Sequence, residues 1–350
     1  MDEWLLKTFK ASLPDLGDLT FLKVPSRRGS RGNVVFLAFE DGHKEPRYVV
    51  KIARDRQDTS DIAREARILQ ALEAIGHLYT AVDGTIPRVL HCDPGVGVLI
   101  ENSLKGRKLR GEFDNISDLR TPRLQHLFDN VSIWLDEFHQ VSLGLVDVLR
   151  DAPNTQHPNA LLEAIREHQF EGIEHPEYLV TLVERTLDSP QLSSTVCHGD
   201  FNPYNVLVVD SRVSGVYDWE DWLLGHPLID RFHFVTVLVG HLPHRDIQRF
   251  PERMVQFLES DDVGVQERNL VSGFLTHSAQ KWGYDVEFVN RYYLVYLYLM
   301  MEKEVRRADF ASMLMWRRLL NWYSMRLERE QPGLVLRSAE ISCEVKNLTF

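Results

Sequence analysis

The hydrophobic period of this sequence changes near residue 104, and that change limits the folds the chain can adopt. Before it, β-rich runs occupy residues 33–39, 48–52 and 95–100, and the turn pair Asp41-Gly42 separates the first two. Between the last two runs, apolar residues recur at helical spacing from Ile62 to Leu72, behind an N-cap candidate at Thr59. We therefore expect a small sheet with one helix packed on it.

After Leu104 the apolar residues recur with a helical period. Residues 124–138, 161–168, 176–186 and much of 265–328 are predicted helices. One hairpin interrupts them, with strands at 206–209 and 213–217 around Asp210-Ser211-Arg212. The pattern predicts an α+β protein with a β-sheet region at 1–103 and a larger, mostly helical region at 104–350.

Charge and composition exclude several classes of protein. The formal net charge of −11 disfavours nucleic-acid binding and mildly favours a cationic small substrate. The most apolar window, residues 292–301, is half the ~20 residues that a membrane span needs, so it predicts a buried core helix. The three cysteines are too few and too scattered for a disulfide framework, and the N-terminus lacks a secretory signal. We expect a cytoplasmic protein, monomeric or homodimeric, with no membrane or nucleic-acid partner.

The candidate chemistry lies on the two sides of the predicted hairpin. His198-Gly199-Asp200 precedes it, with Asn205 five residues after Asp200, and Asp218 follows it. Phosphoryl transfer needs a carboxylate that orients and deprotonates a hydroxyl, together with hard oxygen ligands for Mg²⁺. Asp200 suits the first role, whereas Asn205 and Asp218 suit the second. The short loop and hairpin are expected to bring these three side chains close together at one site.

A cation for the nucleotide phosphates is available in the first region. Lys51 lies in an otherwise apolar strand, where its ammonium needs an anionic partner, and Glu65 on the predicted helix can supply one. Upstream, the stretch 26–33 contains Ser30, Gly32 and Asn33 and offers backbone donors for a phosphate-covering loop. That stretch is more basic than expected for a phosphate-covering loop. The gap of fourteen residues between Lys51 and Glu65 is short for a lysine on a strand and its partner on the following helix.

These residues, in this order, resemble the aminoglycoside phosphotransferase and choline kinase family, whose fold is similar to that of protein kinases. The resemblance runs from about residue 20 to about residue 235 and is carried by Lys51, Glu65, the loop from His198 to Asn205, and Asp218-Trp219-Glu220. It implies a bilobal kinase-like fold that uses ATP and Mg²⁺, with GTP not excluded.

The resemblance also implies individual roles. Asp200 is the expected catalytic base, Asn205 and Asp218 are the expected magnesium ligands, and Lys51 is expected to contact the nucleotide phosphates. Residues 99–102, with Glu101 and Asn102, are the expected hinge whose backbone contacts adenine. His198 and an aspartate after Gly225-His226-Pro227, here Asp230, are expected to brace the catalytic loop.

Structural interpretations compete with some of these roles. Lys51 alternatively lies at an exposed strand edge, and Glu65 alternatively pairs with a neighbouring base on an exposed helix face. His241 and His244 are separated by Pro243 and lack an acidic third ligand, so they are interpreted as loop histidines rather than a metal pair. The tyrosines between residues 292 and 298 are interpreted as core residues.

The expected activity is an ATP- and Mg²⁺-dependent O-phosphotransferase that acts on a hydroxyl of a small molecule. An aminoglycoside-like or other cationic antibiotic is the first acceptor hypothesis, followed by a choline- or ethanolamine-like amino alcohol and a sugar or nucleoside. A catalytically silent nucleotide-binding scaffold on the same fold is the alternative from a different class. The acceptor is expected between the catalytic loop and the helices after residue 235, near Glu220, Asp221, Trp222 and Asp230.

Overall fold

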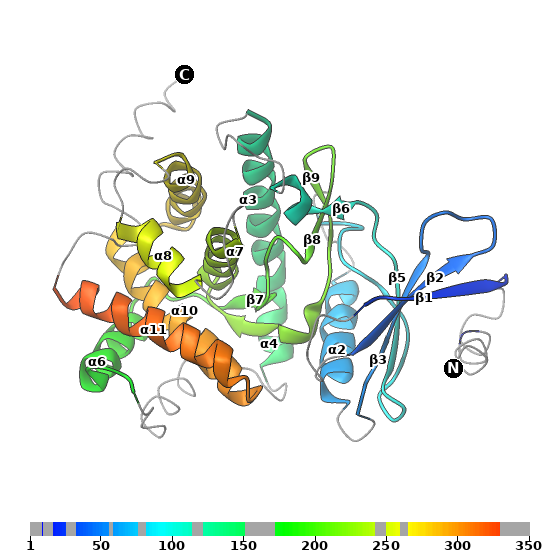
Figure 1. The fold of residues 1–350 in the computed structure, drawn as a ribbon, viewed down its shortest axis with the longest axis horizontal. Helices are drawn as coiled ribbons and strands as arrows, with labels where there is room; N and C mark the ends of the chain where they lie inside the picture. Colours follow the sequence, from blue (N-terminus) through cyan, green and yellow to red (C-terminus); the bar gives the residue numbers. More distant parts are fainter. Residues whose placement is uncertain are drawn as a thin grey trace. The chain divides into compact units, whose positions relative to one another are not determined.

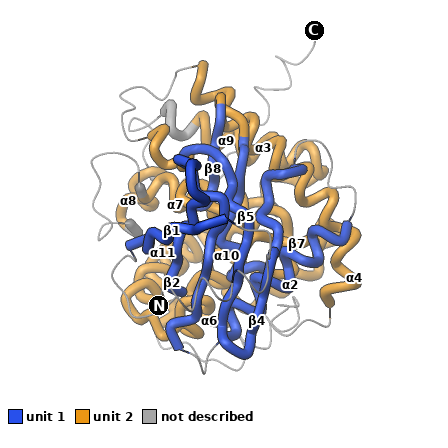
Figure 2. The backbone as a smooth tube through the Cα atoms, turned by 90° about the vertical axis from the view of Figure 1, so that its right-hand side faces the viewer, with its two compact units in different colours: residues 1–107, 205–209, 213–222 blue, residues 108–204, 210–212, 223–350 orange. Residues whose placement is uncertain are grey.

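A computed structural model gives the fold of the chain (Figure 1). It describes residue 9 and residues 17–25, 33–55, 59–75, 82–113, 122–150, 172–241, 250–259 and 265–329. Contacts between residues divide the chain into two units (Figure 2): unit 1 is Met1–Arg107, Asn205–Val209 and Val213–Trp222, and unit 2 is Lys108–Tyr204, Asp210–Arg212 and Leu223–Phe350. Residues 205–209 and 213–222 return to unit 1, so these bounds differ from the expected division after residue 103.

Unit 1 is built on a five-stranded antiparallel sheet with strand order β1-β2-β3-β5-β4. The strands are β1 (Leu19–Lys23), β2 (Val34–Glu40), β3 (Tyr48–Ile52), β4 (Val89–Asp93) and β5 (Val98–Asn102). The predicted hairpin is confirmed as β2 and β3, with Val34 opposite Ile52 and with Gly42 at φ 82° in the turn. Glycine suits that turn because it lacks the Cβ that penalises positive φ.

The two faces of this sheet bury different residues because strand side chains alternate. One face carries Phe36, Tyr48, Val50 and Ile100, which pack with Phe9. The other face carries Leu99 and packs against α2 (Ser60–Ala74) through a small apolar cluster, Ala53, Ile62, Ala66 and Leu99. Lys51 pairs with Leu99 across the strands and therefore belongs to the α2 face. The predicted helix is confirmed and Thr59 is its N-cap residue, although the Thr59 side chain makes no capping hydrogen bond.

The predicted second hairpin is confirmed as β8 (Val206–Val209) and β9 (Arg212–Val216), in a three-stranded sheet with β6 (Arg107–Lys108) in the order β6-β8-β9. Asp210 and Ser211 form its turn with φ 49° and 63°. A two-residue turn with both φ values positive matches the right-handed twist of paired strands, and Asp tolerates it better than most residues. The turn returns the chain so that the Tyr217 amide donates to the Asn205 carbonyl oxygen at 3.1 Å.

Unit 2 is mainly helical (Figure 1). Its helices are α3 (Pro122–Ser142), α4 (Val146–Leu149), α6 (Pro176–Leu187), α7 (Leu228–His241), α8 (Phe250–Glu259), α9 (Val265–Trp282), α10 (Val286–Arg306) and α11 (Phe310–Glu328). Two short strands, β7 (Thr195–Cys197) and β10 (Leu223–Gly225), pair antiparallel. Short 3-10 turns lie at Leu109–Glu112, Leu143–Leu145 and, in unit 1, Trp219–Asp221.

The helix predictions agree with these bounds. The stripe predicted at 124–138 is the buried face of α3, and residues 292–301 are buried throughout within α10, including the four tyrosines. The helix predicted at 161–168 lies outside the described residues. Among the described helices, none combines the length and the apolar character that a membrane crossing requires.

Candidate active site

In unit 1 the Lys51 side chain is buried among carboxylates. Its Nζ lies 2.5 Å from Glu65 Oε1, 3.5 Å from Asp218 Oδ1 and 3.8 Å from Glu101 Oε1. Glu65 comes from α2, Glu101 from β5 and Asp218 from the end of the hairpin. The predicted Lys51–Glu65 pair is therefore present, and the two exposed alternatives are wrong because Lys51 and Glu65 are both buried.

The charges around Lys51 hold it as an ammonium. Burial alone would lower the pKa of Lys51, but Glu101, Glu65 and Asp218 outweigh the burial and raise the pKa well above its ordinary value. An ammonium fixed on a strand by a helix carboxylate is the arrangement that holds a lysine for nucleotide phosphates.

Asp218 is placed by a strained backbone and by the residue that follows it. It has φ 73°, a left-handed value that costs a non-glycine residue free energy. The Trp219 amide donates to Glu65 Oε1 at 2.9 Å, and the Trp219 indole N–H donates to the Val216 carbonyl at 2.9 Å. Glu65 therefore links Lys51 to the segment that carries Asp218. The Asp218 side chain itself stays 41% exposed, so a ligand can reach it.

The remaining acidic residues of unit 1 leave this region with an excess of carboxylates. Burial raises the pKa of Glu101 to about 8, and Glu65 and Asp218 reinforce the effect against the opposing charge of Lys51. Burial also raises the pKa of Glu220 to about 9, reinforced by Asp218 and Asp221. Oxygens Glu65 Oε2 and Glu101 Oε2 are buried and accept no hydrogen bond from the residues that the structure describes. Glu220 Oε2 accepts a hydrogen bond from Asn33 Nδ2 at 3.3 Å.

In unit 2 a buried carboxylate braces the loop that carries Asp200. Asp230, at the start of α7, accepts hydrogen bonds from the amides of His198 and Gly199, both at 2.9 Å. Gly199 has φ 75°, a conformation that L side chains rarely adopt. The His198 ring also contributes, because its Nδ1 accepts from the Asp200 amide at 3.3 Å. The bracing predicted for Asp230 and His198 is present in this geometry.

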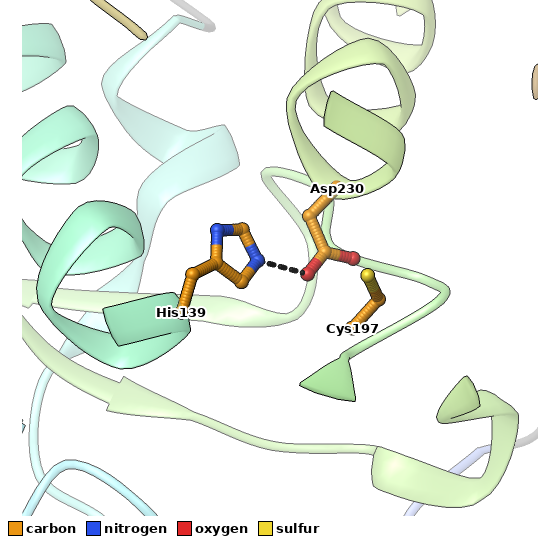
Figure 3. Close-up of side chains that lie close together, drawn as sticks. All are labelled: His139, Cys197 and Asp230. Carbon is orange, nitrogen blue, oxygen red and sulfur yellow. Dashed lines mark hydrogen bonds and ion pairs between the residues drawn. The ribbon is translucent and has the colours of Figure 1, made fainter. Parts of the chain in front are cut away.

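Figure 3 shows that Asp230 has a third partner, His139 from α3, and lies near Cys197 at the end of β7. His139 Nε2 is 3.0 Å from Asp230 Oδ2. The three side chains are close enough for a metal, but their bonds already serve the fold. The Cys197 thiol donates to the His226 carbonyl, and burial raises the pKa of the thiol well above its ordinary value, so it stays protonated. We interpret the cluster as a brace for the loop.

The Asp200 side chain faces two basic residues from helices of unit 2. His233 Nε2 on α7 lies 3.1 Å from Asp200 Oδ1, and Lys303 Nζ on α10 lies 3.3 Å from the same oxygen. Asn202 Nδ2 donates to Asp200 Oδ2 at 3.1 Å. Burial would raise the pKa of Asp200, but Lys303, His233 and His198 lower it well below its ordinary value. The carboxylate is thus ionised and can accept a hydrogen bond from a hydroxyl group.

The other predicted site residues differ in whether the structure describes them and in how far they are buried. Ser30 and Gly32 lie outside the described residues. Asn102 is described, but its side chain accepts from the Arg88 amide, and the adenine contact expected of residues 99–102 stays a prediction. Trp222 and Asp230 are buried. The Trp222 indole N–H donates a hydrogen bond to the Arg64 carbonyl oxygen at 3.0 Å. Their burial argues against the acceptor contacts predicted for them, whereas Glu220 and Asp221 are partly exposed.

Sequence reasoning did not find His139, His233 and Lys303. His139 directly follows the apolar stripe of α3, and His233 lies among aromatic residues of α7, so both fit core patterns. Lys303 lies two residues after the apolar run of α10 and fits the charged end of a helix. Spacing offers a signal for His233 alone, which lies three positions after Asp230 and therefore on the same face of α7.

The oxygens of unit 1 fit a magnesium ion. Asn205 offers an amide oxygen and Asp218 a carboxylate, which are the ligands Mg²⁺ prefers, and the Tyr217–Asn205 backbone hydrogen bond places the two residues on adjoining segments. Burial is the main cause of the raised pKa values of Glu101 and Glu220, and neighbouring carboxylates reinforce it. A divalent cation at Asp218 would favour the ionised forms of these carboxyl groups.

The fold and these two sets of residues define the kinase-like class of α+β proteins. Within this class the chain belongs to the phosphotransferase enzyme family, which matches residues 27–254, more than half of its length. It is an enzyme of the small-molecule kinase type. Comparison with curated protein sequences gives no match.

Solved structures of low sequence identity share this fold. One is the streptomycin–ATP ternary complex of the aminoglycoside phosphotransferase APH(2″)-IIa, 17% identical with a TM-score of 0.55, covering 92% of this chain and 98% of that one. Another is the GDP complex of aminoglycoside 2′-phosphotransferase-IIIa, 14% identical with a TM-score of 0.54, covering 93% and 98%. A third is macrolide 2′-phosphotransferase MphH from Brachybacterium faecium, 15% identical with a TM-score of 0.56, covering 91% and 98%.

Proposed function

We propose that this enzyme transfers the γ-phosphoryl group of ATP to a hydroxyl of a small-molecule antibiotic. The observation that carries the proposal is the Lys51 ammonium, 2.5 Å from Glu65 and 3.5 Å from the accessible carboxylate of Asp218. This arrangement offers a cation for nucleotide phosphates beside an oxygen ligand for their metal. GTP remains an alternative donor, since solved structures of the same fold include a GDP complex.

Each residue has one task in the proposed reaction. Asn205 and Asp218 would hold Mg²⁺, which when bound neutralises charge on the nucleotide phosphates. Lys51 binds the phosphates while Glu65 holds its ammonium in place. Asp200 orients the acceptor hydroxyl and receives its proton, and Asp230 keeps the loop in shape.

An aminoglycoside is the first acceptor candidate, because the net charge is −11 and the fold is shared with aminoglycoside phosphotransferases. A macrolide is the second, because macrolide 2′-phosphotransferases share the fold as well.

The test is product formation by the purified enzyme with Mg-ATP or Mg-GTP and a panel of aminoglycosides, macrolides, choline analogues and sugars, followed by mass spectrometry. We expect one panel class to gain a phosphoryl group. Asp200→Asn should lower turnover about 10²- to 10⁴-fold and keep the nucleotide-induced thermal shift. Asp147→Asn, on an exposed side chain of α4, is the matched control. Nucleotide binding without any transfer would favour the silent scaffold and overturn the proposal.

A further inference from the structure

The catalytic loop of unit 2 meets a lysine that comes from a distant part of the chain. Lys303 Nζ, near the end of α10, lies 3.3 Å from Asp200 Oδ1 and 3.2 Å from the Gly199 carbonyl oxygen. Its side chain is 11% exposed and that of Asp200 is 28% exposed, so both reach a surface that a ligand can contact. A largely buried ammonium beside a candidate base needs an explanation.

Loop bracing does not require this lysine. Asp230 already accepts the amides of His198 and Gly199, and the Asn202 side chain bonds both the Asp200 carbonyl and the Tyr204 amide. These bonds fix the backbone on both sides of Asp200. Besides the Gly199 carbonyl, Lys303 contacts a carboxylate oxygen of Asp200, the atom that an acceptor hydroxyl would approach.

The neighbouring helix face supports a precise placement of Lys303. Tyr296 lies seven residues earlier in α10, hence on the same face, and its hydroxyl is 3.1 Å from His233 Nδ1. The His233 ring stacks on Trp316, and its Nε2 is 3.1 Å from Asp200 Oδ1. Two helices therefore hold one basic group each against the same carboxylate oxygen. The buried aromatic residues of α10 and α11 limit how far these groups can move.

We propose that Lys303 is a catalytic residue that binds the transferred phosphoryl group. The inference rests on the proposed phosphotransferase function. The acceptor hydroxyl lies within about 3 Å of Asp200 when it is deprotonated, and the phosphorus it attacks is about 3–3.5 Å from the hydroxyl oxygen. The ammonium beside Asp200 Oδ1 is therefore within reach of the phosphoryl oxygens, where a cation stabilises the charge of the transition state.

The transfer step is balanced without any further reactant. The acceptor oxygen forms a bond to the γ-phosphorus while the bond from that phosphorus to the bridging oxygen breaks. The nucleoside diphosphate leaves with the electron pair, and the hydroxyl proton passes to Asp200. The Lys303 ammonium transfers no proton in this step and moves its hydrogen bond from the carboxylate to the phosphoryl group.

Lys281 provides a matched control. Like Lys303 it lies on a helix of unit 2 and pairs with an aspartate, at 3.4 Å from Asp136 Oδ2. Asp136 is buried and also pairs with Arg231 at 2.6 Å. This cluster therefore connects helices α3, α7 and α9 and serves the fold. Removal of either ammonium deletes one lysine–aspartate pair, but only Lys303 contacts the candidate base.

The experiment compares Lys303→Met, Lys303→Gln, Lys303→Arg and Lys281→Met with wild type. Turnover is measured with Mg-ATP and the acceptor that the panel identifies, or as slow ATP hydrolysis with water as the acceptor. We expect Lys303→Met and Lys303→Gln to lower kcat about 100-fold, with the KM for nucleotide changed less than about threefold, and Lys303→Arg to recover most of the loss. Lys281→Met should keep wild-type kcat.

The outcomes separate the two proposals. If wild type turns over and Asp200→Asn does not, while both neutral Lys303 variants fold and keep kcat, the role of Lys303 is wrong and the phosphotransferase function stands. If kcat falls only in proportion to lost folded protein, measured by active-site titration with nucleotide, the role is likewise overturned. If wild type transfers no phosphoryl group to any acceptor or to water, the proposed function itself fails.

Discussion

The environments of Lys51 and Asp200 are reversed in charge. In unit 1 one ammonium lies among three carboxylates, whereas in unit 2 one carboxylate lies between Lys303 and His233. Lys51 is buried and Asp200 is partly exposed, and each is held in its ionised form by its neighbours.

This difference indicates which ligand each region is prepared for. A group of carboxyl oxygens around one lysine offers ligands for a divalent cation. An ammonium beside one aspartate is suited to stabilise further negative charge, such as that of a phosphoryl group in transfer. The charges within unit 1 thus favour binding of the metal and the nucleotide, and those within unit 2 favour the transfer step. Four substitutions test this assignment.

The largest effect is expected from Lys51→Met. It leaves Glu65 and Glu101 buried with no cation, which should cost about 3–5 kcal/mol of unfolding free energy. Turnover should fall about 10²- to 10³-fold because the nucleotide phosphates lose their cation. Urea unfolding and steady-state kinetics measure the two effects. Wild-type turnover in this variant would contradict the phosphate-binding role of Lys51.

Asp218→Asn should affect metal dependence more than stability. The Asp218 side chain is 41% exposed, so we expect less than about 1 kcal/mol of destabilisation. Turnover should fall about 100-fold, and more Mg²⁺ should be needed for half-maximal rate. A Mg²⁺ titration after removal of metal with a chelator provides the measurement. Asp210→Asn, in the turn of the same hairpin, should titrate like wild type; identical curves for both variants would remove Asp218 from the metal site.

Glu101→Gln tests the buried carboxyl group beside Lys51 through the pH dependence of the free energy of unfolding. The pKa of Glu101 rises from 4.5 to about 8 in the folded protein, so between these values the folded state holds a proton that the unfolded state has lost. This group therefore makes stability fall as pH rises from 4.5 to about 8. The variant should lack that loss and be more stable than wild type at high pH by about 1–3 kcal/mol.

Urea unfolding of wild type and Glu101→Gln across this pH range provides the measurement. Glu73→Gln, on the exposed face of α2, is the control and should keep the wild-type slope. Equal slopes for all three proteins would show that Glu101 is not a buried acid of raised pKa.

The smallest effect is expected from His233→Gln, which keeps a hydrogen-bond donor but removes a basic group from Asp200. Since Lys303 and His233 lower the pKa of Asp200, the loss of His233 should raise that pKa and move the acid limb of the rate profile to higher pH. Turnover near neutral pH should fall less than tenfold. His277→Gln is matched, because His277 Nε2 contacts Asp136 at the same 3.1 Å. If the acid limb of the pH–rate profile does not move, His233 contributes packing and no electrostatic effect on Asp200.

The local patterns of the chain predicted most of the fold. Alternation in residues 34–40 and 48–52, and helical spacing in α2 and α3, predicted these elements because each buries one face and the period is visible within a few turns. The hairpin at 206–216 was predicted for the same reason. The bounds of unit 1 were not predicted, because the inclusion of residues 205–209 and 213–222 depends on contacts between distant segments.

The sequence by itself determined which groups carry the proposed chemistry: Lys51, Glu65, Asp200, Asn205 and Asp218 are recognisable from residue type and order along the chain. Only the tertiary structure decided their surroundings. His233 and Lys303 contact Asp200 across 33 and 103 residues, and Glu101 turns its carboxyl toward Lys51 rather than toward solvent. The reason is physical. A helical or strand period indicates which residues share a face, but the packing of separate elements decides which faces meet, and burial then determines the charge that each group keeps.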